Sequence, residues 1–286
     1  MRFIIVLALA VGSFACNKDS GEGGTPAVST TSAHAQTAPE SQKAPPAGKS
    51  AGDQAAPAGK VLFLWPDDGS RVFTKTAVKF GVEGRTVRPA GEDATDKTSG
   101  HHHLIIDGAA IPAGQMVPKD EKNIHYGGGQ TEAEIELTPG EHTLTLQFAD
   151  GAHLSYGPDW ATTVKVEAVA PPAPPRVFFV EPTEGAELKS PVKLSFGLEG
   201  FAVRKAGEDV KEKISGHHHL IIDGQPDGLG AMVGKDETHI HYGGGQTEAE
   251  VALTPGKHTL TLQFADGAHR SYGAALSQTI TVNVTE

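Results

Sequence analysis

Short apolar runs recur along residues 60–169, bounded by Gly, Pro and Asp, and several of them alternate apolar and polar residues. Val78, Phe80 and Val82, for example, share one side of their run. This period of two predicts β-strands. The runs that predict strands are 61–65, 76–82, 102–107, 133–137, 142–148 and 162–169. No stretch of ten or more residues has a helical period, so the pattern predicts an all-β domain typical of an immunoglobulin-like β-sandwich of about seven strands.

The same pattern returns 116 residues later, which indicates a duplication. Segments 100–108, 125–132 and 142–151 return almost unchanged as 216–224, 241–248 and 258–267. We therefore predict two tandem immunoglobulin-like β-sandwich repeats, 60–169 and 176–286. Between them, residues 170–175 are rich in proline and predict a short, semi-rigid polyproline linker.

The N-terminus has the pattern of an export signal. A basic start, a short apolar core and small residues lead to Cys16, and the apolar run is too short to span a bilayer. This resembles a bacterial lipoprotein signal, although Ser13 stands where such signals usually have Leu. We therefore predict a signal peptide at 1–15 and lipidation of Cys16. The resemblance implies a protein of the cell envelope, anchored to a membrane at the periplasmic face or the outer membrane.

Composition and charge predict a tether and exclude some classes of partner and site. Residues 16–59 have no aromatic side chain and few aliphatic ones, which predicts a disordered tether. The net charge of −11 argues against nucleic acid as a partner. Cys16 is the one cysteine of the chain, so a cysteine nucleophile and cysteine-ligated zinc are excluded from the two repeats.

Histidine enrichment is the strongest chemical signal, with 14 histidines in the chain. If 101–107 is a strand, His101 and His103 lie on one face, close enough to ligate one metal ion, and His102 lies on the core face. His217 and His219 form the same pair in the second repeat. Imidazole suits zinc, copper and nickel, so a transition-metal site is one interpretation. The alternative is that these histidines are structural and bond to backbone or carboxylate groups.

A second pair distinguishes the repeats. His239 and His241 are two residues apart in the second repeat, whereas Asn123 and His125 occupy these positions in the first. On the metal interpretation, the second repeat has one more ligand and should bind more tightly. The predicted metal ligands are His101, His103, His125, His217, His219, His239 and His241.

The remaining motifs are less specific. His142 and His258 begin strands after Pro-Gly turns and are interpreted as structural. His153 and His269 lie in Asp-Gly-Ala-His turns and are candidates for completing a site, with no sequence signal for their proximity. The run 127–129 of three glycines is no phosphate loop, because Lys-Ser/Thr and a following helix are absent from the sequence pattern. It predicts a turn that lets the backbone approach His125.

Three motifs together resemble a bacterial domain of unknown function, family 4399. They are Gly-His-His-His-Leu-Ile-Ile-Asp at 100–107, His-Tyr-Gly-Gly-Gly-Gln-Thr-Glu at 125–132 and Leu-Thr-Pro-Gly-Glu-His-Thr-Leu at 137–144. The resemblance covers both repeats and implies no catalytic residue. No hydrolase or nucleotide-binding motif is found, so we predict a protein that is not an enzyme. Two functions stay open: transition-metal binding, and a structural module that contacts an envelope protein or polymer.

Overall fold

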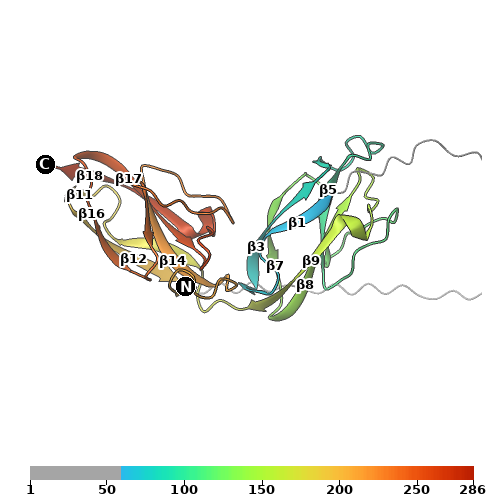
Figure 1. The fold of residues 1–286 in the computed structure, drawn as a ribbon, viewed down its shortest axis with the longest axis horizontal. Coiled ribbons are helices and arrows are strands. Elements are labelled where there is room, and N and C mark those ends of the chain that lie inside the picture. The colour runs from blue at the N-terminus through green and yellow to red at the C-terminus, as the bar shows by residue number, and fades with distance from the viewer. Residues whose placement is uncertain (1–58) are drawn as a thin grey trace, which may run out of the picture. The chain divides into compact units, whose positions relative to one another are not determined.

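A computed structural model describes residues 59–286, and both repeats in this range are all-β sandwiches (Figure 1). The predicted signal peptide, the lipidation site Cys16 and nearly all of the predicted tether lie outside the described residues. None of the helices in residues 59–286 has the length and apolar character that crossing a bilayer requires.

Each predicted run of the first repeat coincides with a strand, although 102–107 and 133–137 extend one residue past the ends of β5 and β7. The strands are β1 (Lys60–Trp65), β2 (Ser70–Phe73), β3 (Lys75–Glu83), β4 (Thr86–Val87), β5 (Ser99–Ile106), β6 (Asn123–Tyr126), β7 (Glu132–Glu136), β8 (Gly140–Ala149) and β9 (Ala161–Val169). The three that the pattern did not predict, β2, β4 and β6, have two to four residues each. Such short strands carry too few residues for an alternation to be visible.

The second repeat follows the same order. Its strands are β10 (Arg176–Glu181), β11 (Glu187–Lys189), β12 (Val192–Glu199), β13 (Ala202–Val203), β14 (Ser215–Ile222), β15 (His239–Tyr242), β16 (Glu248–Val251), β17 (Gly256–Ala265) and β18 (Ser277–Thr285). One turn of 3-10 helix precedes the last strand of each repeat: η1 (Pro158–Trp160) and η2 (Ala274–Leu276).

Each sandwich pairs a three-stranded sheet with a six-stranded one. In the first repeat the small sheet has the order β1-β3-β7, and the large sheet has the order β2-β9-β8-β5-β4. β6 also pairs with β5, antiparallel, beyond the short parallel pairing of β4. β5, which carries the three consecutive histidines, is therefore an inner strand with β8 on one side and β6 on the other.

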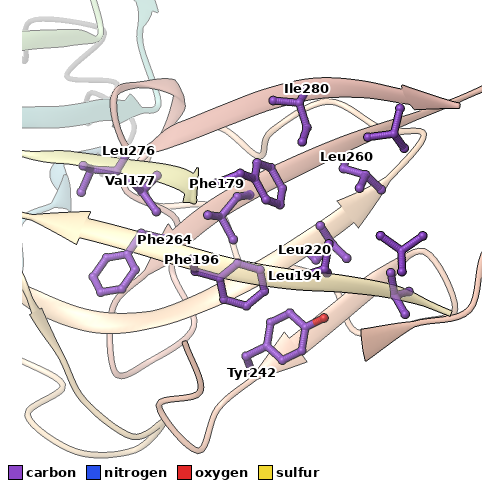
Figure 2. Packing of buried hydrophobic residues seen from close by; sticks show 14 of the residues in the cluster. Val177, Phe179, Leu194, Phe196, Leu220, Tyr242, Leu260, Phe264, Leu276 and Ile280 are labelled. Carbon is purple, nitrogen blue, oxygen red and sulfur yellow. The ribbon is translucent and has the colours of Figure 1, made fainter. Parts of the chain in front are cut away.

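The alternation of side chains explains the core between the sheets. In β7, Ile135 is buried while Glu132, Glu134 and Glu136 face solvent. Leu144 and Leu146 of β8 point inward from the opposite sheet and are fully buried. The second repeat has an equivalent core, in which Phe179, Phe196, Leu220 and Phe264 lie together (Figure 2). Burying side chains of this size stabilises a fold by about 1.5–3 kcal/mol each.

The outer face of the large sheet is also buried at the point where β5 and β8 lie side by side. Gln147, on β8 opposite His103, accepts a hydrogen bond from the backbone N–H of Ile111 and donates to the carbonyls of Gly157 and Trp160. These bonds fix two loops, 107–117 and 150–160, over the sheet. The side chains of β5 that face away from the core are therefore enclosed.

Candidate metal centre

Three predicted ligands come together in each repeat. His101 and His103 lie two residues apart on β5, and His125 of β6 is paired directly with His103. One ligand atom from each of the three lies within 4.8 Å of the others. His217, His219 and His241 form the same group in the second repeat. Because alternate residues of a strand share a face, the pairing of the two strands puts all three rings on one side of the sheet.

The rings converge through their Nε2 atoms. In the first repeat, Nε2 of His101 and Nε2 of His103 are 3.0 Å apart. The ring centres of the three histidines are 4.8–5.0 Å apart in both repeats. The triad thus has the same geometry in two copies whose surrounding loops differ in sequence.

Burial makes these imidazoles neutral at neutral pH. His101 and His103 are fully buried, and burial is the largest cause that lowers their pKa values to about 4 and about 2. Neighbouring imidazoles lower the pKa values further. Burial lowers the pKa values of His217 and His219 in the same way, to about 4 and about 2. A neutral imidazole has a free lone pair on one ring nitrogen, which is the form that ligates metals.

Several of these nitrogens are buried without a hydrogen-bond partner among the described residues. In the second repeat this applies to both ring nitrogens of His217 and His219, and in the first to Nδ1 of His101 and His103. Leaving such a group unsatisfied costs about 1–3 kcal/mol. A cation bound at the point where the Nε2 atoms meet would satisfy those of His217 and His219.

The glycine run has the role that the sequence predicted for it. A Cβ atom on Gly127 would overlap Cε1 and Nε2 of His125, and one on Gly243 would overlap the same atoms of His241. The backbone therefore passes close to Cε1 and Nε2 of the imidazole, which only a residue without a side chain permits.

We expect Gly127→Ala to reduce metal affinity of the first repeat by about tenfold or more, because the methyl group displaces the His125 ring. Gly128→Ala is the matched control: its Cβ would meet only the flexible Gln130 side chain, at 3.1 Å or more. Competition titration with a chromophoric chelator would measure both variants. Equal affinities for the two would contradict the role given to Gly127.

His239 does not join the triad. Its Nδ1 lies 3.0 Å from Oδ1 of Asp236, three residues earlier in the same tight turn. In the first repeat, Asn123 makes the same contact with Asp120. The two residues are equivalent parts of a turn, so the reason to expect tighter binding by the second repeat disappears.

Two further histidines in each repeat have structural surroundings. His102 lies on the core face of β5, as predicted, with its ring 4.9 Å from those of Phe80 and Phe148. His142 lies near the start of β8, where Nδ1 contacts Asp107 at 2.9 Å and Nε2 contacts the carbonyl of Thr138 at 2.8 Å. Both ring nitrogens of His142 are therefore engaged, and the equivalent His258 has the same contacts.

His153 and His269 contact the triads, a proximity that no sequence pattern predicted. Nε2 of His153 lies 3.1 Å from Nε2 of His125, and Nε2 of His269 lies 3.2 Å from Nε2 of His241. Both residues lie in the turn that follows the long strand β8 or β17, and this turn folds back over β5 or β14.

Segments 78–169 and 194–285 both match the domain of unknown function DUF4399. The chain belongs to this family. The match covers the triads of both repeats and confirms the two tandem copies. No curated protein matches the sequence at a significant level.

Solved structures share the β architecture at low similarity. The fibronectin(III)-like modules of Clostridium thermocellum CbhA are 12% identical with a TM-score of 0.27, over 79% of this chain and 94% of theirs. Dimeric latent PorU from Porphyromonas gingivalis is 15% identical with a TM-score of 0.23, over 80% of this chain and 24% of its own. Likenesses at this level carry no information about function.

Proposed function

We propose that this protein is a non-enzymatic, lipid-anchored protein of the cell envelope whose two β-sandwich repeats each bind one transition-metal ion, copper or zinc. The ligands in this proposal are His101, His103 and His125 in the first repeat, and His217, His219 and His241 in the second. The observation that carries it is the convergence of three imidazoles, two of them fully buried, at the same place in both repeats.

The chemistry of the donors favours these metals. All three are neutral nitrogen ligands, which zinc and copper accept readily, whereas calcium and magnesium require oxygen ligands. The rigid β5–β6 and β14–β15 pairs fix the rings before any ion arrives. A preorganised site loses little entropy on binding, which favours affinity.

The surroundings of the remaining polar groups support a role without catalysis. In the His142–Asp107 and His258–Asp223 pairs, both imidazole nitrogens are already engaged, so neither ring is free to act as a general base. The cysteine of the chain lies at position 16, outside both sandwiches.

The rival proposal is a structural module that contacts an envelope protein or polymer, which a tandem β fold of this family also suits. Burial of the triads limits what the histidines can do in that case. His101 and His103 expose no surface and cannot touch a partner, so they would have to be structural. In the second repeat, the unpartnered Nε2 atoms of His217 and His219 make that role costly.

A metal titration tests the proposal. Untagged protein, purified without a metal column, should bind two equivalents of zinc or copper by calorimetry and elemental analysis. The variant with His101, His103, His217 and His219 all changed to alanine should bind none. His239→Asn is the matched control: it gives the second repeat the residue of the first, and binding should be unchanged. An unmodified protein that binds no metal would refute the proposal and favour the structural module.

A further inference from the structure

The turn after β8 is built to present His153. Its backbone has φ +66°, a left-handed conformation that residues other than glycine rarely adopt. The equivalent His269 has φ +65°. An imidazole therefore occupies, in both repeats, a position where glycine or asparagine would fit the backbone with less strain. Conformations of this kind concentrate at functional sites.

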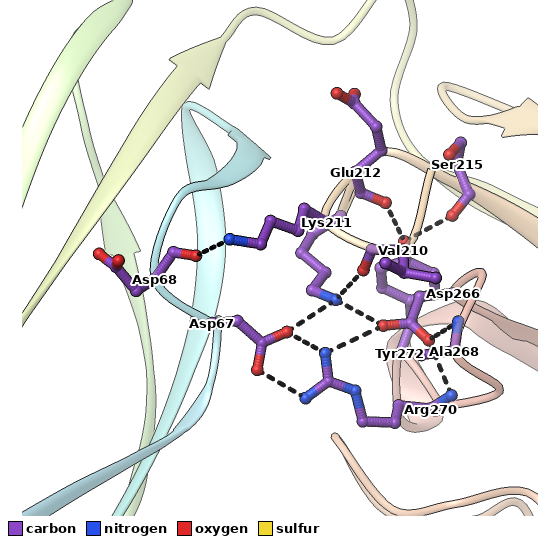
Figure 3. Close-up of polar contacts among 11 residues, drawn as sticks. Asp67, Asp68, Val210, Lys211, Glu212, Ser215, Asp266, Ala268, Arg270 and Tyr272 are labelled. Carbon is purple, nitrogen blue, oxygen red and sulfur yellow. Dashed lines mark hydrogen bonds and ion pairs between the residues drawn. The ribbon is translucent and has the colours of Figure 1, made fainter. Parts of the chain in front are cut away.

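A buried carboxylate fixes the turn in this conformation. In the first repeat, Oδ1 of Asp150 accepts hydrogen bonds from the backbone N–H groups of Ala152 and Leu154, both at 2.9 Å, and Oδ2 accepts one from Lys97. In the second repeat, Asp266 accepts the equivalent bonds from Ala268 and Arg270 (Figure 3). It also accepts one from Lys213. The histidine between the two bonded N–H groups is thereby aimed at the triad.

The ring of His153 lies beside the rings of His125 and His101 and farther from that of His103. Its centre lies 4.8 Å from that of His125, 4.9 Å from that of His101 and 6.0 Å from that of His103. In the second repeat the corresponding distances from His269 are 4.7, 5.0 and 6.1 Å. Two imidazole nitrogens bound to one ion at about 2.0–2.1 Å lie about 2.9–3.4 Å apart. The Nε2 separations of 3.0 and 3.1 Å in the first repeat fall in that range.

We infer that His153 and His269 are the fourth ligands of the two metal sites, each of which is a four-imidazole site that binds copper(II) most tightly. This inference rests on the proposed function. Four neutral nitrogen donors and no carboxylate donor match the ligand preference of copper(II), which also has the highest affinity among the divalent first-row ions. The turn closes the site, because His153 comes from a loop and the other three ligands come from the sheet.

The test uses the full chain and copper(II) as the probe. The double variant His153→Asn, His269→Asn removes both imidazoles and keeps a residue that accepts the left-handed backbone. Loss of a residue that only orients a ligand costs about 10–100-fold in metal affinity, so loss of a ligand should cost at least about a hundredfold. Electron paramagnetic resonance should show nitrogen coupling from four imidazoles in the unmodified protein and from three in the variant.

The outcomes separate this inference from the proposed function. An unmodified protein that binds no copper refutes the proposed function itself. Copper binding with the same spectrum and affinity in protein and variant overturns only the fourth ligand. If the asparagine variant does not fold, the glycine pair His153→Gly, His269→Gly repeats the test with a residue that suits φ +66°. His239→Asn serves as the control and should leave spectrum and affinity unchanged.

Discussion

Replacing Asp150 with alanine is expected to lower the free energy of unfolding by about 3 kcal/mol, a large effect for one side chain in a turn. The carboxylate is almost fully buried and accepts the backbone N–H groups of Ala152 and Leu154 as well as Lys97. Each hydrogen bond to a charged group contributes about 1.5–3 kcal/mol, and the alanine variant leaves the half-buried donors without an acceptor. Urea unfolding followed by circular dichroism would measure the loss.

Two companion variants sharpen this measurement. Asp150→Asn keeps an oxygen for the two N–H groups but loses the charge, so its cost should be smaller, about 1 kcal/mol. Asp159→Ala removes an exposed carboxylate of η1 and should change stability by less than about 0.5 kcal/mol. If Asp150→Ala and Asp159→Ala had equal effects, the carboxylate would not be what fixes the His153 turn.

The alternation of side chains was sufficient to predict the sandwich and its core face. Val78, Leu104 and Leu146 are fully buried between the sheets because each occupies the inward position of a two-residue period. The prediction that His102 points inward was confirmed for the same reason. These features depend on local geometry alone, since successive residues of any strand point to opposite faces.

The enclosure of the site could not be predicted in this way. Alternation put His101 and His103 away from the core, which by itself suggests contact with solvent. Their burial depends on Gln147, whose amide bonds to Ile111 and Gly157 and so brings two loops over the sheet. Which residues a loop bonds to is decided by tertiary packing, and no period in the sequence reports it.

Which histidines lie in the site could not be predicted from their spacing either. The spacing of His239 and His241 is that of a ligand pair, yet His239 bonds to Asp236 while His241 joins the triad. The fourth imidazole comes instead from His153, whose turn has a sequence typical of any tight connection. The left-handed backbone of His153 marks this position, but it is visible only in the structure.

The metal-free protein is expected to lose stability steeply as the pH falls from about 6.5 to about 4. Six histidines are fully or almost fully buried: His101, His102, His103, His217, His218 and His219. Burial lowers the pKa values of four of them to about 4 and of His103 and His219 to about 2. In the unfolded chain each returns to its ordinary pKa of about 6.5.

The direction of this pH dependence follows from the number of protons that the folded and the unfolded states bind. Below about pH 6.5 the unfolded chain takes up protons that the folded protein excludes, so acid favours unfolding. Each histidine contributes at most about 1.4 kcal/mol per pH unit, so the three buried histidines of one repeat contribute about 4 kcal/mol per pH unit. Domains are typically stable by about 5–15 kcal/mol. The metal-free protein should therefore unfold above pH 4, before most of its carboxylates are protonated.

Circular dichroism of metal-free protein from pH 7.5 to pH 3 would measure this transition. A folded protein that remained unchanged at pH 4 would show that the imidazoles are accessible to protons in the folded state. Bound metal should move the transition to lower pH, because an ion that binds only the folded triads stabilises them in proportion to its affinity and concentration. The variant that lacks His101, His103, His217 and His219 should show a shallower acid transition and no response to metal, since it retains only His102 and His218 among the six.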